Sequence, residues 1–335
     1  MKKYVNLFVF VFMIGACLSQ GRAQTKSAVS YKNPVVDIAM PDSTVIKAAD
    51  GYFYVYATES TRNVPIMKSK DLVEWTYCNT AFTNKTRPRF EPKAGIWAPD
   101  INYINGKYVL YYAMSVWGGE QTCGIGVATA NSPQGPFTDH GKMLRSNEIG
   151  VQNSIDPSLL QYEGRNYLVW GSFRGIYVIE LTADGLSIMP GAKKKRIAGT
   201  AFEAVYIHKH DDYYYMFASI GSCCQGVKST YKVVVGRSKK VWGPYKDKTG
   251  KPMLKNGYSL VIGANDHFVG NGHGSQIIQD DAGQDWLLYH GFSRSTPENG
   301  RILLLDQIKW DQEGWPYVEG GSPSYETQKA PVFNN

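Results

Sequence analysis

Cysteine is scarce in this sequence: there are 5 in 335 residues, and no two have the Cys-x-x-Cys spacing of a zinc or redox pair. A disulfide-dense scaffold is therefore excluded at this length. Cys223 and Cys224 are adjacent, and neighbouring cysteines bridge only with unusual backbone geometry. We therefore interpret Cys78, Cys123, Cys223 and Cys224 as small, buried, apolar side chains.

The chain also lacks an apolar run long enough to favour a membrane-spanning helix. The run from Leu7 to Ala16 follows Lys2 and Lys3, and it is too short to span. Residues 1–24 are therefore predicted to be a signal peptide or a lipoprotein signal. Two processing routes stay open, because Ile14-Gly15-Ala16-Cys17 resembles a bacterial lipobox, whereas ordinary cleavage would fall near Ala23. By either route we expect an exported protein that is periplasmic, secreted or lipid-anchored at the bacterial cell envelope.

Charge is limited as well. Charged residues make up 19% of the chain, and the net charge of +7 is modest. An exported chain with no recognised nucleic-acid module is not expected to bind nucleic acid. Contact with a membrane is expected only through a lipid anchor at Cys17, and we expect the mature protein to be a monomer.

Aromatic residues, in contrast, are abundant: there are 23 Tyr and 8 Trp. Together with the absence of helical periodicity beyond the N-terminus, this predicts an all-β protein. Five segments repeat one pattern, in which a polar residue precedes an apolar strand. They are Pro41–Ile46, Pro99–Ile104, Ile155–Leu160, Phe202–Ile207 and Gly272–Ile277.

Each repeated segment is followed by a short turn and an aromatic, β-rich run. The turns contain Gly or Asp, which supply tight reversals between antiparallel strands. The runs are Tyr52–Tyr56, Tyr108–Tyr112, Tyr167–Trp170, Tyr213–Phe217 and Trp286–His290. A unit repeated five times at intervals of roughly 50–70 residues predicts a five-bladed β-propeller with one blade per unit.

The propeller is expected to occupy residues 31–330 as a single domain. Residues 33–36 are expected to pair with the last blade, because an open ring would leave exposed strand edges. The innermost strands of a propeller converge on its axis. The five polar residues of the repeats are therefore predicted to meet in one cluster: Asp42, Asp100, Asp156, Glu203 and His273.

Three carboxylates at equivalent positions indicate chemistry as well as structure. Like charges held close together raise each other's pKa and favour a shared role in proton transfer. Two carboxyl groups that flank a bond, one acting as acid and the other as base, are the arrangement that glycoside hydrolysis requires.

Several motifs of the chain resemble those of glycoside hydrolase family 43. They are Trp97-Ala98-Pro99-Asp100, Ser154-Ile155-Asp156-Pro157, Gly171-Ser172-Phe173 and Phe202–Ile207. The stretch from Cys223-Cys224 to Gly236-Arg237-Ser238 is similar specifically to the arabinan endo-1,5-α-L-arabinanases of that family. The resemblance covers about Asn33 to Trp315.

The resemblance implies an inverting glycosidase that cleaves internal α-1,5-L-arabinofuranosidic bonds of arabinan or arabino-oligosaccharides from plant cell-wall pectin. It assigns Asp42 as the general base that deprotonates the attacking water and Glu203 as the general acid. Asp156 would orient Glu203 and keep its pKa high. The acid and base of an inverting pair are expected to stand about 6.5–9.5 Å apart.

Substrate contacts follow from the same resemblance. Asn153, Ser172 and Phe173 match substrate-contacting positions of the family, and Trp97 is a candidate for stacking on a sugar face. His273 corresponds to a histidine beside a metal ion in the central channel, commonly calcium. The competing interpretation is a buried histidine bonded to carboxylates with no ion, because calcium prefers several oxygen ligands. No organic cofactor is expected.

Three alternatives stay open. The first is an exo-acting α-L-arabinofuranosidase or β-xylosidase of the same family. Such an enzyme would have a closed pocket instead of an open groove, and loops such as Ser115 to Thr122 determine which of the two is formed. A non-catalytic sugar-binding propeller is the second. The third is that Asp37, and not Asp42, is the general base. Family members usually carry Asp-Pro at the position of the base, whereas Asp42 is followed by Ser43.

Overall fold

Short antiparallel strands make up nearly all of the regular structure in the computed structural model, which describes residue 1 and residues 29–334. The described residues form 24 strands, the four-residue helix α1 (Ser146–Ile149) and four 3₁₀ segments. The predicted export signal and lipobox lie outside the described residues. No helix in the described part of the chain combines the length and the apolar character needed to cross a membrane.

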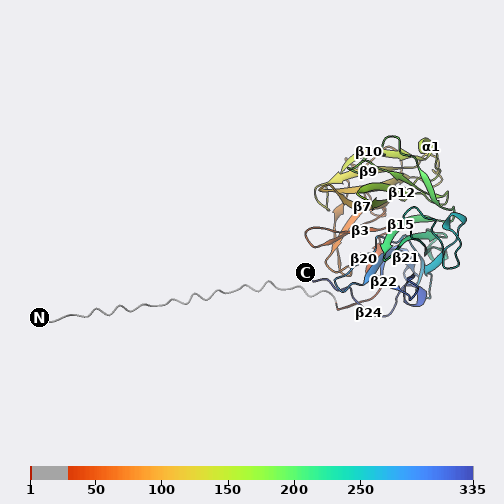
Figure 1. The fold of residues 1–335 in the computed structure, drawn as a ribbon. Helices are drawn as coiled ribbons and strands as arrows, with labels where there is room; N and C mark the ends of the chain where they lie inside the picture. Colours follow the sequence, from red (N-terminus) through yellow and green to blue (C-terminus); the bar gives the residue numbers. More distant parts are fainter. Residues whose placement is uncertain (2–28, 335) are drawn as a thin grey trace.

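The strands form five sheets arranged around a central axis, and four of these blades consist of consecutive strands (Figure 1). Blade 1 contains β3 (Thr44–Lys47), β4 (Phe53–Tyr56), β5 (Pro65–Ser69) and β6 (Trp75–Thr80). Blade 2 contains β7 (Gly95–Ile104), β8 (Lys107–Ser115), β9 (Gly124–Ala130) and β10 (Thr138–Arg145). Blade 3 contains β11 (Ser158–Tyr162), β12 (Arg165–Trp170), β13 (Ile176–Glu180) and β14 (Lys195–Ala198). Blade 4 contains β15 (Glu203–His210), β16 (Tyr213–Ile220), β17 (Lys232–Ser238) and β18 (Ser259–Ile262).

The fifth blade closes the ring with a strand from the other end of the propeller. It contains β19 (Phe268–Gly272), β21 (Asp285–Ser293), β22 (Ile302–Trp310) and β2 (Val36–Ala39), with β20 (Ile278–Gln279) and β23 (Pro316–Tyr317) attached at its edges. Val36 pairs with Leu303, and the backbone N–H of Val35 donates to Leu303. The chain therefore covers an edge that would otherwise be free to pair. β1 (Ser30–Tyr31) and β24 (Gln328–Lys329) form a separate two-stranded sheet.

Tight turns join the first two strands of blades 2, 3 and 4. Asn105 and Gly106 form a two-residue turn between β7 and β8, with φ of 49° and 80° respectively. Positive φ at both central residues is the type I′ pattern, whose twist matches that of antiparallel strands. The predicted turns therefore fix the register of each hairpin.

The apolar cores lie between neighbouring blades. One cluster joins blades 1 and 2 through Tyr56, Ile66, Phe82 and Tyr112, all of which are buried. Similar clusters join the other adjacent pairs around the ring. The aromatic second strands are buried because each blade packs against a neighbour on both faces, which explains the run of apolar residues in β4.

Each blade places one residue in the left-handed backbone region where the chain enters or bends along its innermost strand. These residues are Asp42 (φ 53°), Ala98 (φ 40°), Asp156 (φ 55°), Ala204 (φ 53°) and His273 (φ 51°). A non-glycine residue with this φ costs free energy, and such residues cluster at functional sites. The repeated bend turns the adjacent side chains toward the axis of the propeller.

Candidate active site

A cavity of about 770 Å³ opens over the axis of the propeller. This volume lies in the usual range for ligand-binding clefts. The polar repeat residues on its wall are Asp42, Asp156, Glu203 and His273, which come from four different blades.

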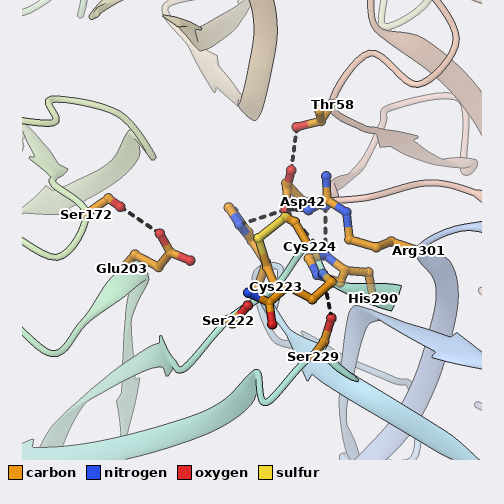
Figure 2. The surroundings of a disulfide bond; sticks show 12 residues. Asp42, Thr58, Ser172, Glu203, Ser222, Cys223, Cys224, Ser229, His290 and Arg301 are labelled. Carbon is orange, nitrogen blue, oxygen red and sulfur yellow. Dashed lines mark hydrogen bonds and ion pairs between the residues drawn. A yellow bond between two sulfur atoms is a disulfide. The ribbon is translucent and has the colours of Figure 1, made fainter. Parts of the chain in front are cut away.

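Asp42 is buried and lies at the centre of a hydrogen-bonded cluster (Figure 2). Its Oδ1 accepts from Nη1 of Arg301 at 2.7 Å, and its Oδ2 accepts from the Thr58 hydroxyl at 2.7 Å. Nδ1 of His273 lies 3.3 Å from Oδ1. The backbone N–H of Asp42 donates to Nδ1 of His290 at 3.0 Å, so both its carboxylate and its backbone are fixed.

Electrostatics keep Asp42 ionised. Burial alone would raise the pKa of this carboxyl, but the positive charges of Arg301 and His273 outweigh burial and hold the pKa well below its ordinary value. Asp42 raises the pKa of His273 in return, against the effect of burial. Asp42 is therefore a carboxylate over the neutral pH range, as a group that accepts a proton must be.

Asp156 and Glu203 form an acidic pair whose pKa values are raised, whereas that of Asp42 is lowered. Burial, followed by the charge of Glu203, raises the pKa of Asp156 to about 8. Burial also raises the pKa of Glu203, although hydrogen bonds from Ser172 and Tyr231 oppose this effect. Ionising both of two neighbouring buried carboxyls costs much free energy, so the pair retains a proton near neutral pH.

Neighbouring polar groups hold Glu203 in position. The Ser172 hydroxyl donates to Oε2 of Glu203 at 2.6 Å, and Nδ2 of Asn153 donates to the Ser172 hydroxyl at 2.9 Å. The phenol of Tyr231, which is buried, also bonds to Glu203. The backbone N–H of Ala204 donates to Oδ2 of Asp156 at 3.2 Å, which links the two acids through the bend that follows Glu203.

Asp100 departs from the prediction that all five polar repeat residues meet in one cluster. It lines a separate small cavity of about 20 Å³, which shares Asp156 and His273 with the large one. The acid of blade 2 has a different position relative to the left-handed bend. In blades 1 and 3 the bend is at the acid itself, whereas in blade 2 it is at Ala98, two residues before Asp100. Backbone N–H of Leu159 and the amides of Asn102 and Gln276 bind the Asp100 carboxyl there, and burial raises its pKa to about 6.

Aromatic side chains line the rim of the cavity. Trp97, Trp117 and Phe173 all border it, and the Trp97 and Trp117 rings lie 5.5 Å apart. Trp117 is 79% exposed, so its face is open to a ligand. Trp97, Asn153, Ser172 and Phe173, the four predicted substrate-contacting residues, therefore all line the same cavity.

The cysteine interpretation was wrong for Cys223 and Cys224. These residues form a disulfide that borders the cavity near Asp42 (Figure 2). They lie in the loop after β16, where no ladder of hydrogen bonds fixes the backbone, so the chain can adopt the geometry that adjacent cysteines need. Cys123 is a buried free thiol as expected, whereas Cys78 is only half-buried.

Four residues of the site were not identified as functional from the sequence. Arg301, Thr58 and Tyr231 contact the acids directly, and His290 accepts the hydrogen bond of the Asp42 backbone N–H. Each stands 16 or more residues from the acid that it contacts, so no short sequence motif joins the two. Only Tyr231 lies in a recognisable motif, because Ser229-Thr230-Tyr231 belongs to the stretch that resembles arabinanases.

Comparison with known proteins identifies the family of this propeller. The sequence model of Glycosyl hydrolases family 43 matches residues 31–316. The chain belongs to glycoside hydrolase family 43, which confirms the resemblance and the five-bladed fold.

Characterised relatives include enzymes of two modes of action. The chain is 36% identical over 290 residues to an extracellular endo-α-(1→5)-L-arabinanase of Bacillus subtilis, covering 82% of this chain and 86% of the relative. It is also 36% identical over 296 residues to an extracellular exo-α-(1→5)-L-arabinofuranosidase of Cellvibrio japonicus, covering 80% and 83%. Among solved structures, a Cellvibrio cellulosa α-L-arabinanase complexed with arabinohexaose superposes with a TM-score of 0.78 at 33% identity, covering 87% and 99%.

Proposed function

We propose that this protein is an exported arabinan endo-1,5-α-L-arabinosidase that cleaves internal bonds of arabinan with inversion. The observation that carries the proposal is the division of charge in the cavity. Asp42 is held ionised by Arg301, whereas the Asp156–Glu203 pair retains a proton. One base and one acid on different blades of one cleft are what inverting hydrolysis needs.

In this mechanism a water beside Asp42 attacks the anomeric carbon while the glycosidic bond breaks. Asp42 takes the water proton, and Glu203 gives its proton to the leaving oxygen, so the anomeric configuration inverts. Thr58 and Arg301 fix the direction of the Asp42 carboxylate. Ser172 fixes Glu203, and we expect the two carboxyls to stand at the inverting separation of about 6.5–9.5 Å.

The Asp156→Asn variant should lose activity at a lower pH than the native enzyme. In the native protein the charges of Asp156 and Glu203 oppose each other's ionisation, so the pair is fully ionised only above about pH 8, the pKa of Asp156. Without the charge of Asp156 the pKa of Glu203 falls, so the basic limb of the kcat/KM profile moves to lower pH and the rate decreases. A pH–rate profile checks this, and an unchanged basic limb would count against the tuning role.

The same variant has a second readout in stability. Burial raises the folded-state pKa of Asp156 above its unfolded value, so its contribution favours folding at low pH and is lost as the pH rises toward about 8. Asp156→Asn should therefore flatten the decline of Tm between about pH 5 and 8. Melting curves across this range test the linkage independently of turnover.

The disulfide is expected to act as an apolar wall for the bound sugar chain. Cys223, Cys224 and Gln225 line the cavity from the loop after β16 of blade 4, whereas Trp97 and Trp117 line it from blade 2. The double substitution Cys223→Ser, Cys224→Ser should raise KM about tenfold, equivalent to about 1.4 kcal/mol, with a much smaller change in kcat. The matched control is Cys78→Ser, which is remote from the cavity and should leave KM unchanged.

The central channel has donors that fit a calcium ion beside His273. The small cavity next to the cleft is lined by His273, Asp100, Asp156 and Gln276, which offer imidazole nitrogen and several oxygen atoms. When bound, the ion would supply positive charge that lowers the pKa of nearby carboxyls. We expect a calcium chelator to lower both Tm and activity, and added Ca²⁺ to restore them, whereas His273→Gln should abolish the response of Tm to Ca²⁺.

The mode of attack is tested by products formed from linear α-1,5-arabinan. A spread of oligosaccharides with a rapid fall in viscosity supports endo action. Arabinose alone from the first time point would instead indicate the exo mode of the Cellvibrio japonicus relative. Binding without any product would favour the sugar-binding alternative, and Ser43→Pro would then be the first reversion to assay.

Export is proposed from the N-terminal pattern, and the relatives named above are described as extracellular. Fractionation of producing cells, comparing the native chain with Cys17→Ser, distinguishes the two routes. Release of the variant from the envelope supports lipidation, and an unchanged distribution supports ordinary cleavage.

A further inference from the structure

A second cluster of chemically active side chains lies away from the substrate cavity. His208 and His210 are two residues apart on β15, so their rings project from the same face of the strand. Asp285 begins β21 of the neighbouring blade, and one candidate ligand atom from each of the three lies within 4.8 Å of the others. None of the three borders the substrate cavity, and His208 stands about 16 Å along β15 from Glu203.

We propose that His208, His210 and Asp285 bind a divalent transition-metal ion, Zn²⁺ in particular, with water in the remaining position. Two imidazoles and one carboxylate are a donor set that zinc takes at sites with three protein ligands. Nδ1 of His210 and Oδ2 of Asp285 are 3.8 Å apart. Ligands of a tetrahedral zinc stand about 3.4 Å apart, so small side-chain rotations close the site.

Neighbouring residues fix two of the three ligands by hydrogen bonds and by ring stacking, as is usual in metal sites. Asp285 is buried, and its two oxygens accept hydrogen bonds from Nε1 of Trp310 at 2.8 Å and from Nε2 of Gln279 at 3.2 Å. The Trp310 ring stacks on His210 with centroids 3.7 Å apart and planes 6° apart. These contacts fix the carboxylate and one imidazole before any ion arrives.

The ring nitrogens of His210 are arranged as metal binding requires, and those of His208 are not held by another group in the described part of the chain. Nε2 of His210 lies 3.5 Å from Oδ2 of Asp211, which leaves Nδ1 directed to Asp285. A ligating histidine usually donates its other ring N–H to a carboxylate, and Asp211 is placed to accept it. None of the described residues hydrogen-bonds the ring of His208. His210 is 24% exposed in its side chain, which gives an ion a path from solvent.

Because the ligands belong to blades 4 and 5, the ion would join two blades directly. An ion that binds only the folded state raises its stability by mass action. Zinc should therefore raise the Tm of the native protein without any need for substrate. The expected effect is on stability, and arabinan hydrolysis should not depend on this site.

The test is titration of the metal-free, full-length mature protein with ZnCl₂ in the presence of excess Ca²⁺, followed by calorimetry and by Tm. The native protein should bind one equivalent of zinc. His208→Gln and Asp285→Asn should each raise Kd by at least about tenfold and remove the Tm increase. The matched control is His267→Gln, because His267 is also an aromatic-stacked histidine but lies outside the cluster.

Two further measurements keep the outcome unambiguous. His208→Gln should retain native arabinan hydrolysis and a native Tm in the absence of zinc, which shows that it folds. His273→Gln should still bind zinc, because its ring lies in the central channel. Absence of zinc binding by the native protein, undiminished binding by both His208→Gln and Asp285→Asn, or loss of binding in His273→Gln alone would overturn the proposal.

Discussion

Glu203→Gln should reduce kcat on linear arabinan by about 10³-fold or more while the propeller stays folded. General acid catalysis contributes about 10²–10⁴-fold, and an amide cannot protonate the leaving oxygen. The amide oxygen can still accept the hydrogen bond of Ser172, so the local structure is preserved. Removal of one of two neighbouring buried acids also relieves the repulsion that raises the pKa of Asp156, so Tm should not fall.

The choice of substrate separates the loss of an acid from general damage to the site. An arabino-oligosaccharide with an activated phenol leaving group needs little protonation, so Glu203→Gln should recover most of its rate on it. Glu120→Gln is the matched control, since Glu120 borders the same cavity but pairs with Arg174. Equal losses on both substrates, or appreciable activity of Glu203→Gln on arabinan, would contradict the assigned role.

Asp42→Asn should also reduce kcat by about 10³-fold, for a different reason. The variant cannot take the proton from the attacking water, and general base catalysis contributes on the same scale as acid catalysis. It also leaves the partly buried Arg301 without its counter-ion, so stability should fall by about 1–3 kcal/mol. Azide, which attacks without losing a proton, should partly restore turnover and give a glycosyl azide of inverted configuration.

Asp37→Asn decides between the two candidate bases. Asp37 is exposed on β2, and its Oδ1 accepts a hydrogen bond from Asn299. It does not border the substrate cavity, so this variant should keep native kcat and KM. Native activity of Asp42→Asn together with a severe loss in Asp37→Asn would reverse the assignment.

Much of the fold could be predicted because its signals are local and repeated. The turn at Asn105-Gly106 and the aromatic strands that follow each polar segment are readable in short windows. Closure through the residues before Asp42 follows from the need to cover a strand edge, and β2 provides it, although its pairing begins at Val35–Val36.

The predictions that failed depend on register and on loop geometry. Asp100 looked equivalent to Asp42 and Asp156, but the bend of blade 2 occurs at Ala98, and with this displacement Asp100 lines the small cavity instead of the substrate cleft. Cys223 and Cys224 were interpreted as buried apolar side chains because adjacent cysteines bridge only with unusual backbone geometry, yet they form a disulfide in a loop that is free of strand pairing. Neither difference leaves a signal in residue spacing alone.

The five-fold repeat, the aromatic strands and the carboxyl residues that enter the cleft can all be predicted from the sequence, because each depends on local spacing and on the period of a strand. The charge state of those carboxyls depends on the closed propeller. Arg301 reaches Asp42 across 259 positions of sequence, and Glu203 faces Asp156 from the next blade. A pKa depends on burial and on charges a few ångströms away, and only the closed ring brings these groups together.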